Sequence, residues 1–306
     1  MKTIAAILRE MERPMPYANS RPLEIEELEL SGPAADEILV EVKGAGLCHS
    51  DLSVINGSRA RQMPMVLGHE ASGIVREVGA GVRGIQPDDH VIFTFIPSCG
   101  HCRYCSVGKP SLCEPGAEAN NAGLLMNGAQ RFSREGKPYF HHCGVSGYSQ
   151  YTIAVPGSLV KIDQSLPFEL ATLFGCAVST GTGAAMNTAN IRPGQSVAVF
   201  GMGGVGLAAL MGAKACNAGQ IIAVDLLDSK LEMAKKIGAT HVVSAKDNNP
   251  VEVIQDLTHG GVEIAIESLG NATVLAPFGD VARQTGGRRR RCWPFGRARA
   301  WSRAPF

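Results

Sequence analysis

The chain has 306 residues, of which 45% are hydrophobic and 19% charged; this length predicts two domains, and the composition is that of a soluble globular chain. Seven of the 29 Lys and Arg lie in residues 286–306, and the rest of the chain carries 22 basic and 28 acidic side chains, a net charge of −6. An acidic body argues against nucleic acid as the main partner.

The N-terminal segment offers no targeting signal. Its apolar stretch is too short for a signal peptide and is broken by Arg9 and Glu10. We therefore expect a cytoplasmic protein that does not bind membranes.

Residues 1–170 predict a β-rich domain. Four runs of β-branched residues stand between Gly and Pro turn signals and are expected as strands, at residues 37–46, 71–82, 90–95 and 148–155. Residues 99–147 predict long loops. The whole segment is expected to form an irregular barrel-like domain.

The pattern changes near Thr172. Four short, almost wholly apolar strands are expected at residues 196–201, 220–225, 240–245 and 262–268. Helical stretches separate them, at residues 205–219 and 229–239. Apolar strands alternating with helices imply a parallel α/β sheet. Because a full dinucleotide-binding fold has six strands, residues 171–287 predict an incomplete Rossmann-type domain.

The segment from residue 288 to 306 differs from everything before it. Residues 286–306 contain both tryptophans and no Asp, Glu, Leu, Ile or Val. After a helix at residues 272–284, where a fifth apolar strand is expected, the composition becomes arginine-rich. We interpret residues 288–306 as an out-of-frame end, which predicts a sheet with an unpaired edge, aggregation and little turnover. The alternatives are a genuine structural segment and a nucleic-acid-binding arm.

Four cysteines are close together in "CGHCRYCSVGKPSLC", at Cys99, Cys102, Cys105 and Cys113. Four thiolates close a tetrahedral zinc shell and leave no position for substrate, so this pattern predicts a structural zinc. An iron–sulfur cluster is the alternative, but its last spacing is usually shorter and the final Cys is followed by Pro. Unligated thiols are the third reading.

A second set of metal ligands is dispersed along the chain. Cys48, His69 and Cys176 supply two thiolates and an imidazole, the three protein ligands of a catalytic zinc whose fourth position stays open. Taken singly, each residue is more often a small buried Cys or a His without a metal. The prediction therefore depends on the three being found together.

The glycine pattern Gly-x-Gly-x-x-Gly follows a predicted strand and opens a helix, with Gly201, Gly203 and Gly206 as its glycines and Gly204 in the same loop. This context predicts a pyrophosphate-binding turn. Asp225 ends the next strand, where a carboxylate accepts hydrogen bonds from an adenosine ribose and repels a 2′-phosphate. The pattern favours NAD over NADP.

These three motifs, in this order and spacing, resemble the zinc-dependent medium-chain alcohol dehydrogenases over residues 20 to 287. The Cys2His zinc set is a known property of alcohol dehydrogenase. The resemblance implies a GroES-like catalytic domain followed by a Rossmann domain, with the active site between them. It also implies NAD-dependent conversion of an alcohol to an aldehyde or ketone, and a homo-oligomer whose dimer edge is missing here.

The resemblance also assigns roles to single residues. Glu70 matches an acidic residue behind the catalytic zinc, Ser50 the hydroxyl that accepts the alcohol proton, and His49 a position near the pyrophosphate. Four further residues match cofactor contacts: Thr180 and Val205 on the nicotinamide side, Asp225 and Lys230 on the ribose. In this reading zinc acts as a Lewis acid on the alcohol oxygen, and hydride passes to the nicotinamide.

The chain departs from the family at Ser53, where many members have the His that ends a proton relay; water or His49 would then carry the proton. We assign no role to Cys143, Cys216 or Cys292, and expect none for the pair His141-His142. The alcohol is not fixed by the sequence: primary, aromatic and hydroxymethyl-thiol substrates all remain open. An inactive zinc-binding remnant is the alternative to an active enzyme.

Overall fold

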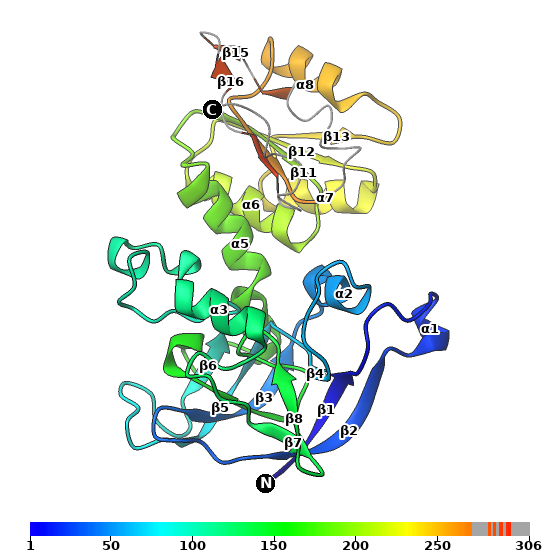
Figure 1. The fold of residues 1–306 in the computed structure, drawn as a ribbon. Coiled ribbons are helices and arrows are strands. Elements are labelled where there is room, and N and C mark those ends of the chain that lie inside the picture. The colour runs from blue at the N-terminus through cyan, green and yellow to red at the C-terminus, as the bar shows by residue number, and fades with distance from the viewer. Residues whose placement is uncertain (271–280, 283, 286–287, 290–291, 295–306) are drawn as a thin grey trace. The chain divides into compact units, whose positions relative to one another are not determined.

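The computed structural model describes residues 1–270, 281–282, 284–285, 288–289 and 292–294 (Figure 1). The chain divides into two compact units, one comprising Met1–Cys176 and the other beginning at Ala177. The first unit contains the barrel and the second the parallel sheet. In the described residues, no helix is long and apolar enough to cross a membrane.

A closed barrel and a five-stranded sheet build the first unit. The barrel has the order β1-β2-β7-β8-β4, with β1 (Lys2–Leu8), β2 (Leu23–Leu30), β7 (Phe132–Arg134), β8 (Lys137–His141) and β4 (Met65–Val66). The sheet has the order β10-β6-β5-β3-β9, with β10 (Leu159–Lys161), β6 (His90–Phe93), β5 (Ala71–Val78), β3 (Ile38–Ala45) and β9 (Tyr151–Ala154). Alternate residues of β1 point inward: Ala5 and Ile7 are buried while Ile4 is exposed.

Short helices join these strands. The α-helices are α1 (Tyr17–Ser20), α2 (His49–Ile55), α3 (Glu114–Ala122) and α4 (Phe168–Ala171). The 3-10 helices are η1 (Cys105–Val107), η2 (Pro110–Leu112), η3 (Pro156–Ser158) and η4 (Thr172–Gly175). Helix α2 and the 3-10 helix η4 matter most here, because each adjoins a predicted zinc ligand.

The prediction of long loops over residues 99–147 is wrong. This stretch contains η1, η2, the nine-residue helix α3, and the hairpin of β7 and β8. Helix α3 has Pro at its start, which suits the first turn, and ends at Gly123 with φ of 71°. The hairpin turn consists of Glu135 and Gly136, both with positive φ, as a type I′ turn requires. Helix α3 has little apolar periodicity, and so the sequence pattern did not reveal it.

A five-stranded parallel sheet forms the second unit, in the order β13-β12-β11-β14-β17. Its strands are β11 (Ser196–Phe200), β12 (Gln220–Asp225), β13 (His241–Ser244), β14 (Ile264–Glu267) and β17 (Cys292–Pro294). The helices are α5 (Ala177–Gly183), α6 (Gly204–Ala215), α7 (Asp228–Ile237) and α8 (Pro250–Thr258), with a π-helix, η5, at Ala184–Thr188. A two-stranded ribbon pairs β15 (Gln284–Thr285) with β16 (Arg288–Arg289).

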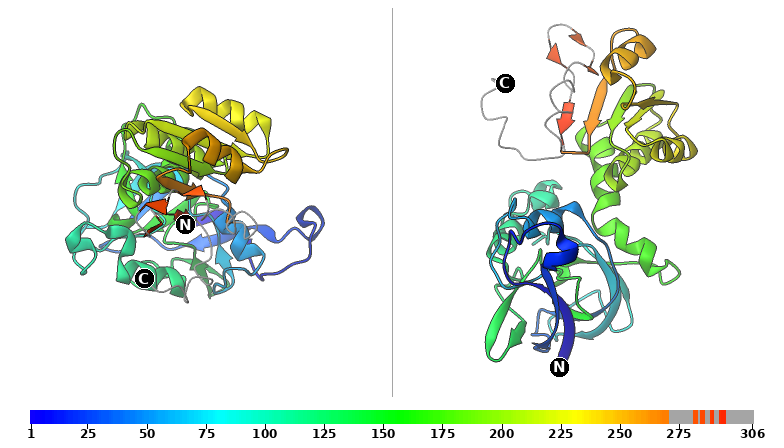
Figure 2. Two further views of the ribbon diagram at one scale, coloured as in Figure 1. Left: turned by 90° about the horizontal axis from the view of Figure 1, so that it is seen from above. Right: turned by 90° about the vertical axis from the view of Figure 1, so that its right-hand side faces the viewer.

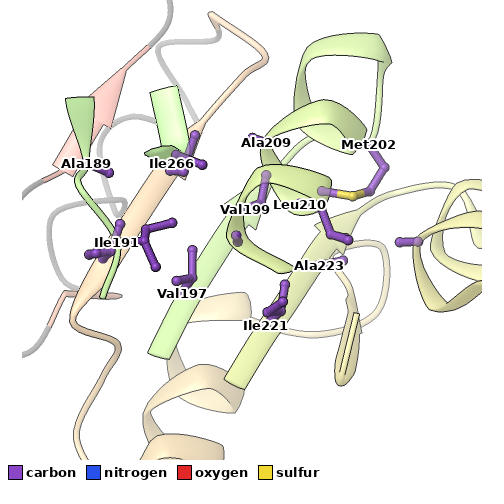
Figure 3. Packing of buried hydrophobic residues seen from close by; sticks show 14 residues of the cluster. Ala189, Ile191, Val197, Val199, Met202, Ala209, Leu210, Ile221, Ala223 and Ile266 are labelled. Carbon is purple, nitrogen blue, oxygen red and sulfur yellow. The ribbon is translucent and has the colours of Figure 1, made fainter. Parts of the chain in front are cut away.

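Apolar layers cover both faces of the parallel sheet, which is why its strands are almost continuously apolar. Val197 and Val199 pack on one face with Leu210 of α6 and with Ala189 and Ile191, which follow η5 (Figure 3). Ala198 points to the other face and packs with Ile254 of α8. The four strands predicted from the sequence are therefore β11 to β14.

The prediction that the sheet ends after its fourth strand differs from the structure. Cys292–Pro294 forms β17, which pairs in parallel with β14 through the register of Ala265 with Cys292 and Glu267 with Pro294 (Figure 2, right view, red beside orange). A strand edge presents backbone N–H and C=O groups, which an extended segment of any composition can pair. The helix expected at 272–284 falls mostly on residues 271–280, outside the described residues, as do residues 295–306.

Candidate functional site

The first unit brings together the three dispersed metal ligands. Cys48 directly precedes α2, His69 lies between β4 and β5, and Cys176 follows η4. Their ligand atoms and a carboxylate oxygen of Glu70 all lie within 4.8 Å of one another. His69 and Glu70 are buried, as is Cys176, and Cys48 is partly exposed.

These residues fit a tetrahedral zinc. With a zinc–sulfur distance of about 2.3 Å, two thiolate ligands stand about 3.8 Å apart, which is compatible with a 4.8 Å limit. Both ring nitrogens of His69 are buried and make no well-directed hydrogen bond among the described residues; Nδ1 has Asp51 at 3.0 Å, whereas Nε2 is left to the other ligand atoms of the cluster. A buried imidazole nitrogen without a partner is costly unless a ligand uses it. The donor set of two sulfurs and one nitrogen is typical of zinc rather than of magnesium or calcium.

The electrostatics of the cluster also favour a cation. Contact with Cys176, and then with His69, lowers the pKa of the Cys48 thiol although burial opposes this. Contact with Cys48, and then burial, raises the pKa of Cys176. Burial lowers the pKa of His69, but contacts with Asp51 and Cys48 outweigh it and raise the pKa to about 10. A divalent cation would displace the remaining protons from these ligands.

Glu70, Ser50 and His49 surround the cluster to different degrees. Oε1 of Glu70 lies 3.9 Å from Nε2 of His69. Burial, and then the charge on Cys48, raises the pKa of Glu70 to about 7. The backbone N–H of Ser50 donates to the Cys48 sulfur, and the Ser50 side chain is half-buried. His49 is exposed at the first position of α2.

Asp51 completes the cluster and was not predicted from the sequence. Its Oδ2 lies 3.0 Å from Nδ1 of His69, and both side chains are buried. A carboxylate at this nitrogen sets the tautomer in which Nε2 is free to bind a metal. The spacing carried a signal: Cys48 and Asp51 are three residues apart at the start of a helix, and so lie on one side of it.

His142 is a second residue that sequence reasoning missed. Its Nδ1 lies 3.2 Å from Oδ1 of Asp51, and its ring meets that of His69 edge to face at 5.6 Å. The expectation that His141-His142 has no role did not anticipate this contact. No local pattern could have revealed this contact, because 91 residues of chain separate the two partners and the barrel brings them together.

The four clustered cysteines also converge. Their sulfurs lie within 4.8 Å of one another, with Cys113 buried and the other three partly exposed. The backbone N–H of Cys99 donates to the Cys113 sulfur at 3.3 Å, and that of Cys102 to the Cys99 sulfur at 3.2 Å. Backbone N–H groups of Cys105 and Glu114 lower the pKa of Cys102 to about 6. Such N–H donors stabilise thiolates, which are the form that binds zinc.

The glycine-rich turn of the second unit joins β11 to α6. Gly201 has φ of 89°, which favours glycine. A Cβ on Gly206 would lie 1.7 Å from the carbonyl oxygen of Gly201, so only glycine permits this close turn. Gly203 precedes the helix and has nothing within 4 Å of its Cβ position, and Gly204 begins α6. The twelve-residue helix therefore presents free N–H groups to open space, which suits a pyrophosphate.

Asp225 ends β12 and holds this turn. Its Oδ2 accepts the backbone N–H of Met202 at 2.7 Å, and its Oδ1 accepts that of Leu227 at 3.0 Å. Nζ of Lys230 lies 3.8 Å from Oδ2. The predicted ribose pair is therefore adjacent in the structure, beside the first glycine of the turn.

Thr180 and Val205 lie on neighbouring helices. Thr180 is half-buried in α5, and Val205 is in the first turn of α6. A Cβ on Gly181 would lie 2.2 Å from the carbonyl oxygen of Val205, so α5 packs directly on the start of α6. The two residues that the resemblance places on the nicotinamide side therefore come from helices in contact.

Two protein-family models match this chain, one within each of its two compact units. Residues 34–164 match the family model of the alcohol dehydrogenase GroES-like domain, and residues 204–287 match that of the zinc-binding dehydrogenase domain. The chain is 41% identical over 262 residues to an S-(hydroxymethyl)glutathione dehydrogenase of Escherichia coli O1:K1, a match that covers 85% of this chain and 71% of the relative.

Solved structures are also similar. Benzyl alcohol dehydrogenase from Acinetobacter calcoaceticus matches with a TM-score of 0.83 and 35% identity, over 92% of this chain and 74% of that one. An alcohol dehydrogenase zinc-binding domain protein from Burkholderia ambifaria matches with a TM-score of 0.84 and 33% identity, over 95% and 80%.

The resemblance predicted from three motifs is thereby confirmed, and so is the order of a GroES-like domain followed by a Rossmann-type domain. The metal and cofactor roles of single residues stay predictions. The chain belongs to the zinc-dependent medium-chain alcohol dehydrogenase family.

Proposed function

We propose that this protein oxidises an alcohol to an aldehyde or ketone with NAD, using one catalytic and one structural zinc. The observation that carries the proposal is the cluster of Cys48, His69 and Cys176, whose two sulfurs and one imidazole nitrogen lie within 4.8 Å of one another. A set of three protein ligands leaves the fourth zinc position open for an oxygen ligand. The four sulfurs of Cys99 to Cys113 leave none, which suits a structural ion.

In this proposal the chain's own residues place and deprotonate the alcohol. When bound, the catalytic zinc supplies a Lewis acid that lowers the pKa of an alcohol, and the nicotinamide supplies the hydride acceptor. Ser50 is two residues from Cys48, and its side chain is half-buried. In this proposal its hydroxyl accepts the alcohol proton while its own proton passes on to water or to His49. Ser53 does not relay it, because its hydroxyl donates to the His49 carbonyl at 3.0 Å.

The preference for NAD is proposed from Asp225. Its buried carboxylate would lie against the ribose, where a 2′-phosphate would bring a second negative charge into the same space. Nζ of Lys230 lies 3.8 Å from this carboxylate, near enough for both side chains to contact the ribose, and its positive charge partly balances that of Asp225. The open Cβ position of Gly203 leaves room for a pyrophosphate at the start of α6.

The substrate is proposed as a primary alcohol, with aromatic and hydroxymethyl-thiol alcohols as the two classes to compare first. One matched relative is named for a hydroxymethyl thiol and another for benzyl alcohol. The test is NADH formation by the zinc-loaded chain, followed by its absorbance, with benzyl alcohol, simple primary alcohols and S-(hydroxymethyl)glutathione.

The sequence analysis predicted little turnover because it expected an unpaired edge beside β14. Since β17 pairs that edge, we expect steady turnover with at least one of these alcohols, and none after Cys176→Ala. Cys216→Ala is the matched control, because Cys216 lies at the end of α6 and outside both sulfur clusters. Absence of NADH formation by the fully metal-loaded chain with every alcohol would contradict the proposal.

A further inference from the structure

The buried carboxylate of Asp51 is contacted on both of its oxygens. Oδ2 lies 3.0 Å from Nδ1 of His69 and 3.2 Å from the hydroxyl of Tyr148. Oδ1 lies 3.2 Å from Nδ1 of His142 and accepts the backbone N–H of Gly68 at 3.3 Å. Asp51 therefore has two partners on each oxygen, and rotation of the carboxylate would break contacts on both.

The Tyr148 hydroxyl is held in the same position by a second acceptor. It lies 3.1 Å from the carbonyl oxygen of Gly46 as well as 3.2 Å from Asp51. Burial, and then the charge on Asp51, raises the pKa of Tyr148, so the hydroxyl keeps its proton as a donor.

His142 is an unusual residue for its surroundings. It follows β8, its side chain is fully buried, and its neighbour Cys143 belongs to a hydrophobic cluster. A buried imidazole costs free energy that an apolar ring of similar size would avoid. Asp51 faces its Nδ1 at 3.2 Å, and the thiol of the next residue, Cys143, is a second polar contact of the ring. The presence of a polar ring at position 142 is explained if the Asp51 carboxylate needs a second imidazole beside it, in addition to that of His69.

We propose that His142 is a positioning residue of the catalytic metal centre, which acts through Asp51 to fix the ring of His69. His142 and Gly68 hold one oxygen of the carboxylate, so that the other stays directed at Nδ1 of His69. Nε2 of His69 is then held toward the sulfurs of Cys48 and Cys176. This inference rests on the proposed function, because it requires a metal at those three ligands.

The same three residues could instead bind a metal of their own, since Asp51, His69 and His142 have ligand atoms within 4.8 Å of one another. The distances from Asp51 to the two imidazoles favour direct contact over a shared metal ion. Zinc–nitrogen and zinc–oxygen bonds of about 2.1 Å would place tetrahedral ligand atoms about 3.4 Å apart. The observed separations of 3.0 and 3.2 Å are shorter than that, as in direct ion pairs between an imidazole and a carboxylate.

Cobalt substitution tests the proposal without depending on turnover. Co²⁺ bound by thiolates gives a charge-transfer absorption and ligand-field bands, and its dissociation constant is measured by competition with a chelator. The signal of the Cys48 site is the part lost in Cys176→Ala, which keeps the four-cysteine site. A wild-type chain that shows no such part would contradict the proposed function rather than this inference.

His142→Phe keeps the size of an aromatic ring but removes the donor. We expect Co²⁺ to bind the Cys48 site about 10-fold more weakly, with shifted ligand-field bands, as is usual for loss of an outer partner of a metal ligand. His142→Gln keeps an N–H donor within reach of Asp51 and should stay within about threefold of wild type. His241→Gln, in the second unit, is the matched control and should change nothing.

Two outcomes would overturn the proposal. The first is wild-type affinity and an unchanged spectrum in His142→Phe. The second is a third bound Co²⁺ that disappears in this variant while the Cys48 site is unaffected, which would show a separate metal site. If His142→Phe does not fold, His142→Met replaces it, and equal Co²⁺ affinities for the Met and Gln variants would contradict the proposal.

Discussion

Asp225 accepts the backbone N–H of Met202, at 2.7 Å, through the same carboxylate that is predicted to select the cofactor. The group that would face the ribose thus also fastens the turn that would face the pyrophosphate. Its charge and its hydrogen bonds are separate properties: an amide removes the charge and keeps an acceptor for one of the two N–H groups, those of Met202 and Leu227.

Asp225→Asn should relax the preference for NAD over NADP. The amide oxygen can still accept the Met202 N–H, while the charge that would repel a 2′-phosphate is gone. We expect the ratio of kcat/KM for NAD to that for NADP to fall by about 10-fold or more, which corresponds to about 1.4 kcal/mol.

Two variants control this experiment. Asp225→Gly should relax the ratio too, but it should also weaken binding of both cofactors because the turn loses its acceptor. Asp228→Asn removes an exposed charge three residues away and should leave the ratio unchanged. An unaltered ratio in Asp225→Asn would exclude the charge of Asp225 as the selecting feature.

Substitution by alanine should affect different properties at Gly203 and Gly206. In Gly206→Ala the new methyl meets the Gly201 carbonyl oxygen at 1.7 Å, so we expect a loss of unfolding free energy of about 2 kcal/mol or more. Gly203→Ala adds a methyl to open space, so unfolding should change by less than about 1 kcal/mol while NAD binding weakens.

Thermal unfolding and calorimetric titration with NAD separate these two effects. If Gly203→Ala binds NAD like the wild type, the open space before α6 does not receive the pyrophosphate.

The fully loaded chain should contain two zinc ions. Cys176→Ala should lower this to one by elemental analysis, because two remaining ligands hold zinc too weakly to survive dialysis. Cys113→Ala should also lose one ion and, in addition, destabilise the first unit, since Cys113 is fully buried. Cys216→Ala should keep both. A wild-type chain that never exceeds one zinc would refute the two-site assignment.

His141 should make the first unit acid-sensitive. Burial, and then the charge on Arg131, lowers the pKa of His141 to about 3, whereas an unfolded histidine titrates near 6.5. Below pH 6.5 the unfolded chain therefore binds a proton that the folded chain does not. The stability contributed by neutral His141 is complete above pH 6.5 and falls by up to about 1.4 kcal/mol per pH unit as pH decreases toward 3.

His141→Gln should make this slope shallower by up to that amount between pH 6 and 4. All five tyrosines lie in the first unit, so tyrosine fluorescence during urea unfolding reports on this unit alone. His241→Gln serves as the control. Equal slopes for wild type and His141→Gln would show that His141 accepts its proton without unfolding.

The sequence predicted those elements of the fold whose residue pattern repeats over a few neighbouring positions. The strands β11 to β14 are apolar runs with helices between them, and Gly201 to Gly206 mark the turn by their spacing. Helix α3 was missed because its surface is mostly polar, so neither helical nor strand periodicity appears. Strand β17 was missed for a different reason: its pairing is between backbones, and the sequence of Cys292–Pro294 shows no strand pattern.

The candidate site was predictable to the extent that its residue types are unusual. Cysteine and histidine beside glycine-rich turns are rare enough to be noticed, so Cys48, His69 and Cys176 could be proposed as a set. Asp51 has a weak local signal in its helical spacing from Cys48. His142 and Tyr148 reach the same carboxylate only because the barrel closes, and a contact made by tertiary structure leaves no mark in the neighbouring sequence.

Cys48 and Cys176 stand at opposite ends of a long stretch of chain, roughly 130 positions apart, so an ion bound by both would also cross-link the chain. An ion held by both closes a loop that contains most of the first unit. Closing this loop lowers the conformational entropy of the unfolded chain and so stabilises the folded first unit by about 4–5 kcal/mol. The much shorter loop from Cys99 to Cys113 contributes about 3 kcal/mol. A chelator that strips the catalytic position would then do two things at once: it would stop turnover and release the chain to unfold.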